Sequence, residues 1–183
     1  MMTTRDAAFT EWVRSTLDRY EGPLIRYAAR ITGDHEQARD VVQDTFLRLW
    51  TAERPRVEDH VGEWLFTVCR NRAIDVVRKE RRMDQLTEAQ AAQCESREPT
   101  PAAVAERRET TSRVLRELET LAENQQEVIR LRFQNGMSYK EISRITGHSV
   151  SNVGFLIHTA IRALRQRLRG EFDLAREAGG SVS

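Results

Sequence analysis

The chain has 183 residues, of which 39 % are apolar and 31 % are charged, and its net charge at pH 7 is +1. This balance is typical of a soluble globular protein of one or two domains, and it excludes a disordered or a fibrous chain. No apolar run approaches the roughly 20 residues of a membrane span, so we expect no membrane insertion.

Glycine, proline and helical periodicity divide the first part of the chain. Gly22-Pro23 is predicted to separate two amphipathic helices, and Gly33 is predicted to end the second of them. Asp34 is suited to cap a third helix, because its carboxylate can accept a free backbone N–H. A fourth helix follows from residue 61, so this part is predicted to be a compact four-helix domain. Its expected buried positions, spaced three and four apart, are Ala38, Val41, Val42, Thr45, Phe46, Leu49, Leu65, Val68, Cys69, Ala73, Ile74 and Val77.

The second part of the chain is predicted to be a smaller helical domain behind a linker. Residues 83–112 are rich in Gln, Glu and Ala and contain Pro99 and Pro101, a composition typical of a linker. Helical periodicity then returns, and a short helix over Ser138–Thr146, a turn at Gly147 and a last helix capped by Ser149 or Ser151 are expected. No strand-period run appears. The sequence therefore predicts an all-α chain of two small helical domains, 1–82 and 113–170, joined by the linker and followed by a tail, 171–183.

Charge is distributed unevenly along the chain. Residues 60–82 carry a net charge of +3 and residues 128–170 a net charge of +7, whereas residues 83–127 between them carry −5. Two basic segments inside helical patterns indicate contact with a polyanion. The alternative interpretation is that these charges only solvate helix faces.

The pattern of a short helix, a glycine turn and a longer helix predicts a helix-turn-helix. Its second helix would place polar and aromatic side chains in a major groove, where serine, asparagine and histidine can reach base edges and arginine can bind phosphates. A helical hairpin that merely closes a small core is the alternative. The candidate DNA-binding residues are Ser149, Ser151, Asn152, Phe155, His158, Thr159 and Arg162, and Arg165 is predicted to lie on the same face.

The fourth helix combines basic and aromatic side chains in a way that suits single-stranded nucleic acid. Positive charge can follow the backbone, while rings stack against bases. Ordinary core packing remains the alternative for Trp64 and Phe66, and Cys69 is expected to be a small buried hydrophobe. The polar and basic residues of this helix that fall outside its buried stripe are Arg70, Asn71, Arg78, Lys79, Arg81 and Arg82.

Three ordered blocks of the chain resemble the extracytoplasmic-function (ECF) class of bacterial sigma-70 factors. Asp34–Trp50 (DHEQARDVVQDTFLRLW) is similar to the family signature DxxxAEDxxQExFxxxW, and Trp64–Arg78 (WLFTVCRNRAIDVVR) to WLxxIARNxxxDxxR. Leu121–Ser143 is similar to the C-terminal block LPxxxRxxxxLR…GxSYxEIA. Each block alone is moderately specific, and together they are strongly specific.

The resemblance implies an alternative sigma factor that binds core RNA polymerase and directs initiation at chosen promoters. The first domain would be sigma region 2, which binds the polymerase β′ clamp helices through Asp40, Gln43, Asp44 and Arg48. Trp64, Asn71, Arg72, Asp75, Arg78 and Lys79 of the fourth helix would contact and help to open the −10 element. The Thr51–Glu63 loop would hold a flipped base. The last domain would be region 4, which reads the −35 element and touches the β flap. The acidic linker would run toward the active-site and RNA-exit channels, and an anti-sigma factor is an expected partner.

The chain departs from the family pattern in the recognition helix. Where the family commonly has TVKSRLHRA, this chain has NVGFLIHTA, so that Gly154, Leu156 and Thr159 replace three usual basic residues. Arg39 also stands where the first signature usually has Glu. The resemblance therefore predicts a different −35 preference from the common one.

Other classes of function receive less support from the sequence. A standalone helix-turn-helix regulator that acts without polymerase is the main alternative. The four histidines and two cysteines show no ligand spacing and no glycine-rich phosphate loop is present, so we expect no catalytic site, metal or cofactor. The start of the chain lacks the apolar stretch of a secretory signal, and Cys69 and Cys94 form no CxxC pair. A reducing, cytoplasmic environment is expected.

Overall fold

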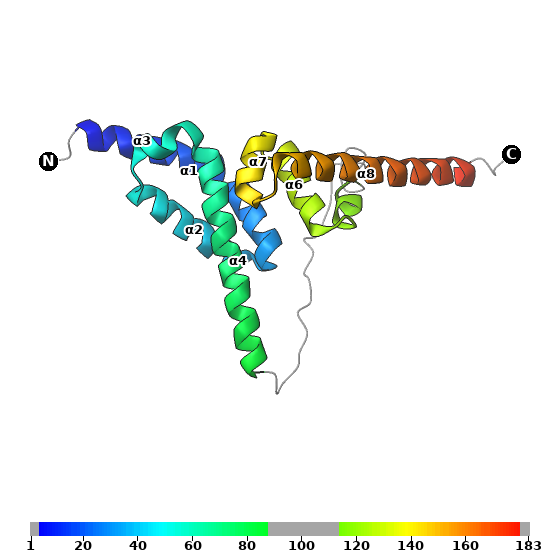
Figure 1. Ribbon diagram of the computed structural model, residues 1–183, viewed down its shortest axis with the longest axis horizontal. Coiled ribbons are helices and arrows are strands. Elements are labelled where there is room, and N and C mark those ends of the chain that lie inside the picture. The colour runs from blue at the N-terminus through cyan, green and yellow to red at the C-terminus, as the bar shows by residue number, and fades with distance from the viewer. Residues whose placement is uncertain (1–3, 88–113, 180–183) are drawn as a thin grey trace. The chain divides into compact units, whose positions relative to one another are not determined.

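The computed structural model describes residues 4–87 and 114–179, and every regular element among them is a helix (Figure 1). The expected all-α fold class is therefore confirmed. The chain divides into two units, Met1–Arg97 and Glu98–Ser183. Most of the predicted linker, Cys94 and the last four residues lie outside the described residues. None of the described helices is both long enough and apolar enough to cross a membrane.

The N-terminal unit is built on three long helices. They are α1 (Thr4–Thr32), α2 (His35–Thr51) and α4 (Val61–Thr87), and each packs on the other two. Two short turns, α3 (Arg54–Val57) and η1 (Glu58–His60), join α2 to α4 within the segment predicted to be a loop. The core includes an edge-on contact between Tyr27 of α1 and Phe66 of α4, whose ring centroids are 5.2 Å apart. The fully buried large side chains include Leu24, Val41, Leu49, Leu65 and Phe66.

The predicted helix break at Gly22-Pro23 is wrong, because α1 continues through Pro23 without interruption. Proline in a helix interior removes one backbone hydrogen bond and costs about 3 kcal/mol. Here both halves of the helix bury side chains, Val13 and Thr16 before the proline and Leu24 and Tyr27 after it. Packing on both sides of Pro23 outweighs the local preference for a break. The predicted cap at Asp34 is confirmed, since its Oδ1 accepts from the Gln37 N–H at 2.8 Å.

The described residues of the C-terminal unit, 114–179, form four helical segments. Residues 114–119 are helical, and α6 (Glu123–Phe133), α7 (Tyr139–Thr146) and α8 (Val150–Gly179) follow. α8 packs on both α6 and α7, and α8 continues beyond residue 170, where the sequence predicts the domain to end. The buried side chains of this unit include Val128, Leu131, Ile142, Ile145, Val153, Ile157 and Ala160.

Candidate nucleic-acid interface

The turn between α7 and α8 is fixed by hydrogen bonds at both of its ends. At the end of α7, Gly147 adopts a left-handed conformation with φ 79°, which favours glycine. At the start of α8, the Ser149 hydroxyl accepts from the Asn152 N–H at 3.2 Å, so Ser149 rather than Ser151 is the cap. The Ser143 hydroxyl donates to the His148 carbonyl at 2.6 Å. These contacts set the start of α8 relative to α7, as a helix-turn-helix requires.

The outer face of α8 exposes most of the predicted DNA-binding residues. Ser151, Phe155, His158 and Arg162 recur at steps of four, three and four residues, so they share one side of the helix. All four are exposed, as is Ser149 at the cap, whereas Asn152 and Thr159 are half-buried at the edges of this side. We name Ser151, Phe155, His158 and Arg162 the reading face.

Thr159 is tied inward rather than presented to solvent. Its hydroxyl accepts a hydrogen bond from the Gln125 side-chain amide of α6 at 3.1 Å and lies 2.9 Å from the Phe155 carbonyl, to which it donates. Thr159 therefore links α8 to α6. Gln125 was not among the residues predicted from the sequence, because helical periodicity gives a residue's face but not its partner on another helix.

A shallow basic hollow on α8 overlaps the C-terminal end of the reading face. Its volume is about 520 Å³, and its lining contains two arginines and one histidine within two turns of helix. Arg165, next to the predicted Arg162, adds a second guanidinium there. Such a concentration of donors matches the phosphate backbone of a nucleic acid. The lining residues are His158, Ile161, Arg162, Arg165 and Gln166.

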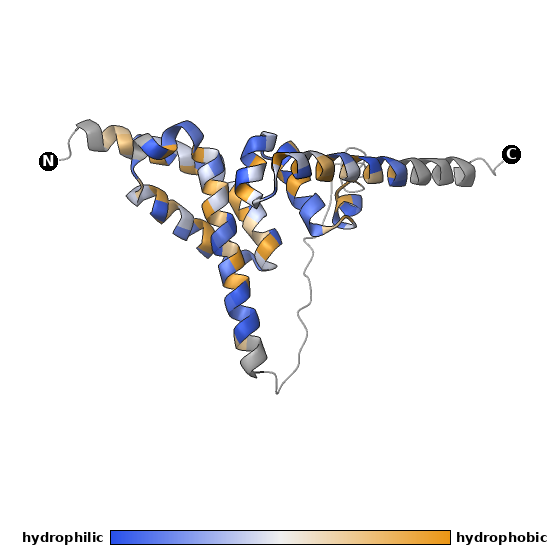
Figure 2. Cartoon of the chain, in the orientation of Figure 1, coloured by the Kyte–Doolittle hydropathy of each residue, from blue (hydrophilic) through white to orange (hydrophobic). Residues whose placement is uncertain are grey.

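The second candidate surface lies on α4. Trp64, Asn71, Asp75 and Arg78 fall at steps of seven, four and three residues, which places them along one side of the helix. Trp64 is half-buried and the other three are exposed. Figure 2 shows that the half of α4 farther along the chain is mostly hydrophilic.

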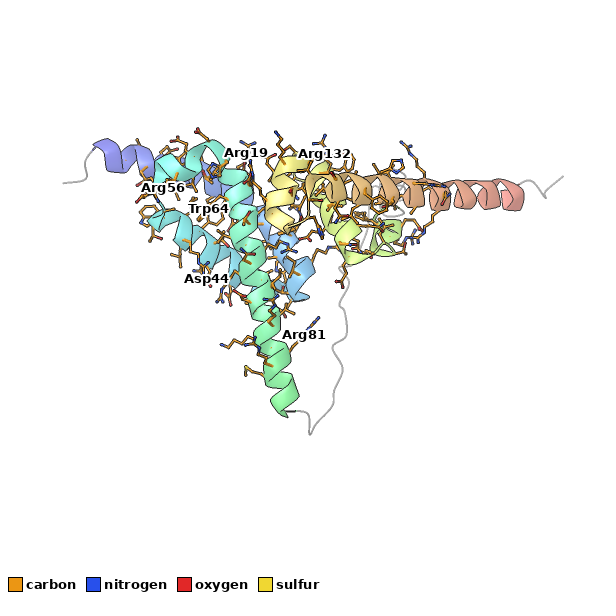
Figure 3. The ribbon with its side chains drawn as sticks, in the orientation of Figure 1. Arg19, Asp44, Arg56, Trp64, Arg81 and Arg132 are labelled. Atoms are coloured by element: carbon orange, nitrogen blue, oxygen red, sulfur yellow. The ribbon has the colours of Figure 1, made fainter. Side chains whose placement is uncertain are left out.

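The far half of α4 is strongly basic. Arg78, Lys79, Arg81 and Arg82 are all exposed, and Arg81 projects from the helix in Figure 3. The one acidic residue among them, Glu80, accepts a hydrogen bond from the Gln37 side-chain amide of α2. The carboxylate therefore turns toward α2, and the other side of this helix end carries positive charge.

One ion pair joins α2 to α4 and brings together residues predicted for two different roles. The Arg72 Nε lies 2.8 Å from the Asp44 Oδ2, and both side chains are about 40 % exposed. Asp44 was predicted to bind polymerase and Arg72 to bind DNA. An exposed pair of this kind contributes about 0.2–1 kcal/mol. The pair therefore places the two candidate surfaces next to each other along α2 and α4.

The exposed side of α2 combines charge with an apolar hollow. The predicted Asp40, Gln43 and Arg48 are exposed there. Beside them a hollow of about 640 Å³ opens between α1 and α2, and Leu47 and Trp50 at its edge are 61 % and 51 % exposed. Neither residue was predicted to lie on the surface. Both fall between the buried positions of α2, and this spacing could have indicated their exposure. Exposed large apolar side chains beside charged ones mark a protein-binding surface.

The buried thiol of Cys69 is not suited to act as a nucleophile or as a metal ligand. Its side chain is fully buried, as expected. Burial raises the pKa of the Cys69 thiol to about 12, against a hydrogen bond with Thr45 that acts in the opposite direction. Within residues 4–87 and 114–179, no three His, Cys, Asp or Glu side chains lie close enough together to hold a metal ion.

Comparisons with known proteins agree with this arrangement. The family model described as Sigma-70 region 2 matches residues 16–83, and the one described as Sigma-70, region 4 matches residues 111–164. The chain is 34 % identical over 169 residues to the ECF RNA polymerase sigma factor SigL of Mycobacterium tuberculosis, covering 89 % of this chain and 92 % of that relative. It is 28 % identical over 155 residues to the ECF RNA polymerase sigma factor SigM of Bacillus subtilis, covering 84 % and 91 %.

Solved structures with a similar fold are also known. The sigma factor RpoE from Bartonella quintana, in complex with the anti-sigma factor NepR, aligns with a TM-score of 0.64 at 23 % identity, over 85 % of this chain and 96 % of that one. CnrH, in complex with the cytosolic domain of CnrY, aligns with a TM-score of 0.55 at 26 % identity, over 88 % and 90 %.

Proposed function

Because this chain belongs to the ECF class of sigma-70 factors, we propose that its two helical units divide promoter recognition between them. The chain is an alternative sigma factor that acts with core RNA polymerase on promoter DNA. The family is one of non-enzymatic initiation factors, so RNA synthesis belongs to the polymerase. We assign region 2 to residues 1–82 and region 4 to 113–170.

In this proposal the face of α4 contacts the −10 element. The observation that supports this proposal is that one side of α4 carries Trp64, Asn71, Asp75 and Arg78. The exposed basic end of the same helix follows them. Arginine and lysine would follow the phosphates of the opened strand, and the half-exposed indole would stack on a base. Strand opening is then selective for sequence. Unstacking a base costs a few kcal/mol, and only a strand that makes matching contacts with the protein offsets this cost. Arg72 and Lys79 flank this face.

The exposed side of α2 is the proposed docking surface for the β′ clamp helices. Asp40, Gln43, Asp44 and Arg48 provide polar contacts, and the apolar hollow with Leu47 and Trp50 provides the area that such an interface needs. The Asp44–Arg72 ion pair then connects the polymerase contact to the DNA contact at a single point.

The C-terminal unit is proposed to read the −35 element through α8 and to touch the β flap. RpoE forms a complex with the anti-sigma factor NepR, and we propose that an anti-sigma protein likewise binds this chain in the cytoplasm. The acidic linker is proposed to run toward the active-site and RNA-exit channels.

The test is promoter-dependent transcription with purified core polymerase. The Asp40→Arg variant should bind core about tenfold more weakly or worse and lose run-off product, because a charge at a docking surface is reversed. Asp40 is preferable to Asp44, since reversing Asp44 also disturbs Arg72. The matched control is Asp18→Arg on α1, an exposed acidic residue outside the proposed surface. Core binding by Asp40→Arg equal to that of the control would contradict the docking assignment.

A gel shift with promoter duplex distinguishes a sigma factor from a standalone helix-turn-helix regulator. A sigma factor of this kind should bind the duplex poorly without core and tightly with it. Tight, sequence-specific binding by the chain alone would favour the regulator. The two sigma-region matches along one chain already weigh against that alternative.

A further inference from the structure

Phe155 stands out among the apolar side chains of the C-terminal unit. It is 64 % exposed, the largest value among the large hydrophobic residues of the described chain. The side chain therefore adds little to the core, and leaving an aromatic ring in water forgoes the stabilisation that its burial would give. The fold does not explain this phenylalanine.

The position of Phe155 on α8 is that of a base-reading residue. It lies in the second turn after the Ser149 cap, between Ser151 one turn before it and His158 one turn after it. In a helix-turn-helix, the residues in the first turns of the second helix contact base edges in the major groove. Phe155 is thus the only residue of the reading face whose side chain has no polar atom.

Positive charge is absent from this part of α8. Residues 150–161 contain no lysine or arginine. The three positions where basic residues are common in the family hold Gly154, Leu156 and Thr159 here, none of which carries a cation. A Cβ at Gly154 would lie 3.6 Å from the Tyr139 ring, Leu156 is buried, and Thr159 is tied to Gln125. Base reading by a bidentate arginine is therefore unavailable in the first three turns of α8, and Arg162 is the first cation of the reading face.

The major groove offers one apolar group that a phenylalanine can recognise. At the major-groove edge thymine presents a C5-methyl group beside its acceptor, whereas guanine, cytosine and adenine present no methyl group there. Phe155 has no donor or acceptor in its side chain. We infer that Phe155 reads the C5-methyl groups of thymine in the −35 element, with Ser151 and His158 beside it. This inference rests on the proposed function, because it assumes that α8 enters promoter DNA.

The experiment removes the methyl group and nothing else. A promoter is taken from a transcript start mapped after overexpression of the chain. Duplexes are prepared with thymine or with deoxyuridine throughout the −35 element, and with the same number of deoxyuridines in the spacer as a control. Their dissociation constants are measured with the holoenzyme made from the full chain, at one fixed salt concentration.

The wild-type holoenzyme should lose about fourfold in affinity for each contacted methyl that is removed, which corresponds to one buried carbon. Phe155→Ala should bind the thymine duplex more weakly and show no further loss with deoxyuridine. Phe133→Ala is the matched control, since Phe133 on α6 is 63 % exposed and lies off the reading face. It should keep the wild-type response to deoxyuridine, and Phe155→Leu should keep part of it.

Several results would overturn the inference. Equal affinity of the wild-type holoenzyme for both duplexes would do so, as would a mapped −35 element without thymine or a Phe155→Ala variant that still responds to deoxyuridine. If Phe155→Ala instead weakened core binding in the absence of DNA, without any response to the methyl groups, the ring would be a protein contact. In these cases normal promoter-dependent transcription would leave the proposed function standing, whereas absence of any such product would overturn both.

Discussion

At the residue scale, the helix period determines which side chains are buried, whereas the packing of neighbouring helices determines which partners they contact. The three- and four-residue spacing of apolar residues in α2 correctly predicted the burial of Val41, Val42 and Leu49, because one apolar face must meet the core. Thr159 shows the limit. Its place beside the reading face was predictable, but its bond to Gln125 was not, since that bond depends on how α6 lies against α8.

Cys69 yields a prediction at the same scale. With Cys94→Ser as background, the native Cys69 thiol should react with a thiol reagent at pH 8 about a hundredfold or more slowly than in urea. The reactive species is the thiolate, and a pKa of about 12 leaves almost none of it at pH 8. Fast labelling of the folded protein would contradict the buried environment.

The same pKa predicts how stability responds to alkaline pH. The thiol has a pKa raised from 9.0 to about 12 on folding, so the folded state holds this proton more tightly. The contribution to stability is fully present below about pH 9 and is lost as the pH rises toward 12. Urea unfolding of the Cys94→Ser protein, compared with Cys94→Ser/Cys69→Ala across this range, measures it.

At the element scale, the sequence located helix ends well where a side chain forms the end. Asp34, Ser138 and Gly147 each act locally, through one short hydrogen bond or one backbone conformation, and these contacts are visible in the spacing of residues. Pro23 misled the prediction because its effect is opposed by distant contacts. Burial of Leu24 and Tyr27 against other helices keeps α1 continuous, and no local pattern reports those partners.

The capping box at the start of α7 is predicted to stabilise the C-terminal unit. The Glu141 N–H donates to the Ser138 hydroxyl at 3.3 Å, and the Ser138 N–H donates to the Glu141 carboxylate at 2.7 Å. Ser138→Ala should lower the free energy of unfolding of the C-terminal unit by about 1 kcal/mol at pH 7. Urea unfolding measures this change. Ser151→Ala, an exposed serine in the first turn of α8, should change it by less than about 0.5 kcal/mol.

This difference should depend on pH in a defined direction. The hydrogen bonds from the Ser138 side chain and backbone lower the pKa of Glu141, with a smaller contribution from Arg144. A lowered pKa gives stability that is present above the ordinary glutamate value and lost as the pH falls through the folded value. The effect of Ser138→Ala should therefore shrink in acid. An effect that grows in acid would contradict the capping box.

At the scale of the whole molecule, the division into two helical units follows from where apolar periodicity stops and restarts. Each unit has its own buried core, around Leu24, Leu49 and Leu65 in one and around Val128 and Ile142 in the other. The sequence predicted both units and their order. It could not predict the hollow between α1 and α2, because that depends on the packing of side chains from two helices.

Separate cores should unfold in separate steps. Leu65→Ala should lower the stability of the N-terminal unit by about 2–5 kcal/mol, and Ile142→Ala should do the same to the C-terminal unit. Hydrogen exchange followed by segment measures both. Each substitution should reduce the protection of backbone amides from exchange in its own unit and leave the protection in the other unit unchanged. A loss of protection in both units from either substitution would show one cooperative structure instead.

The self-contained cores bear on how such chains diversify. A genetic crossover between the two units leaves every buried contact of each unit intact, so recombination can join an existing N-terminal half to a new reader of upstream DNA without a folding defect. A lineage can thus acquire a new set of target genes in one event, while the part that docks on the transcription machinery is inherited unchanged.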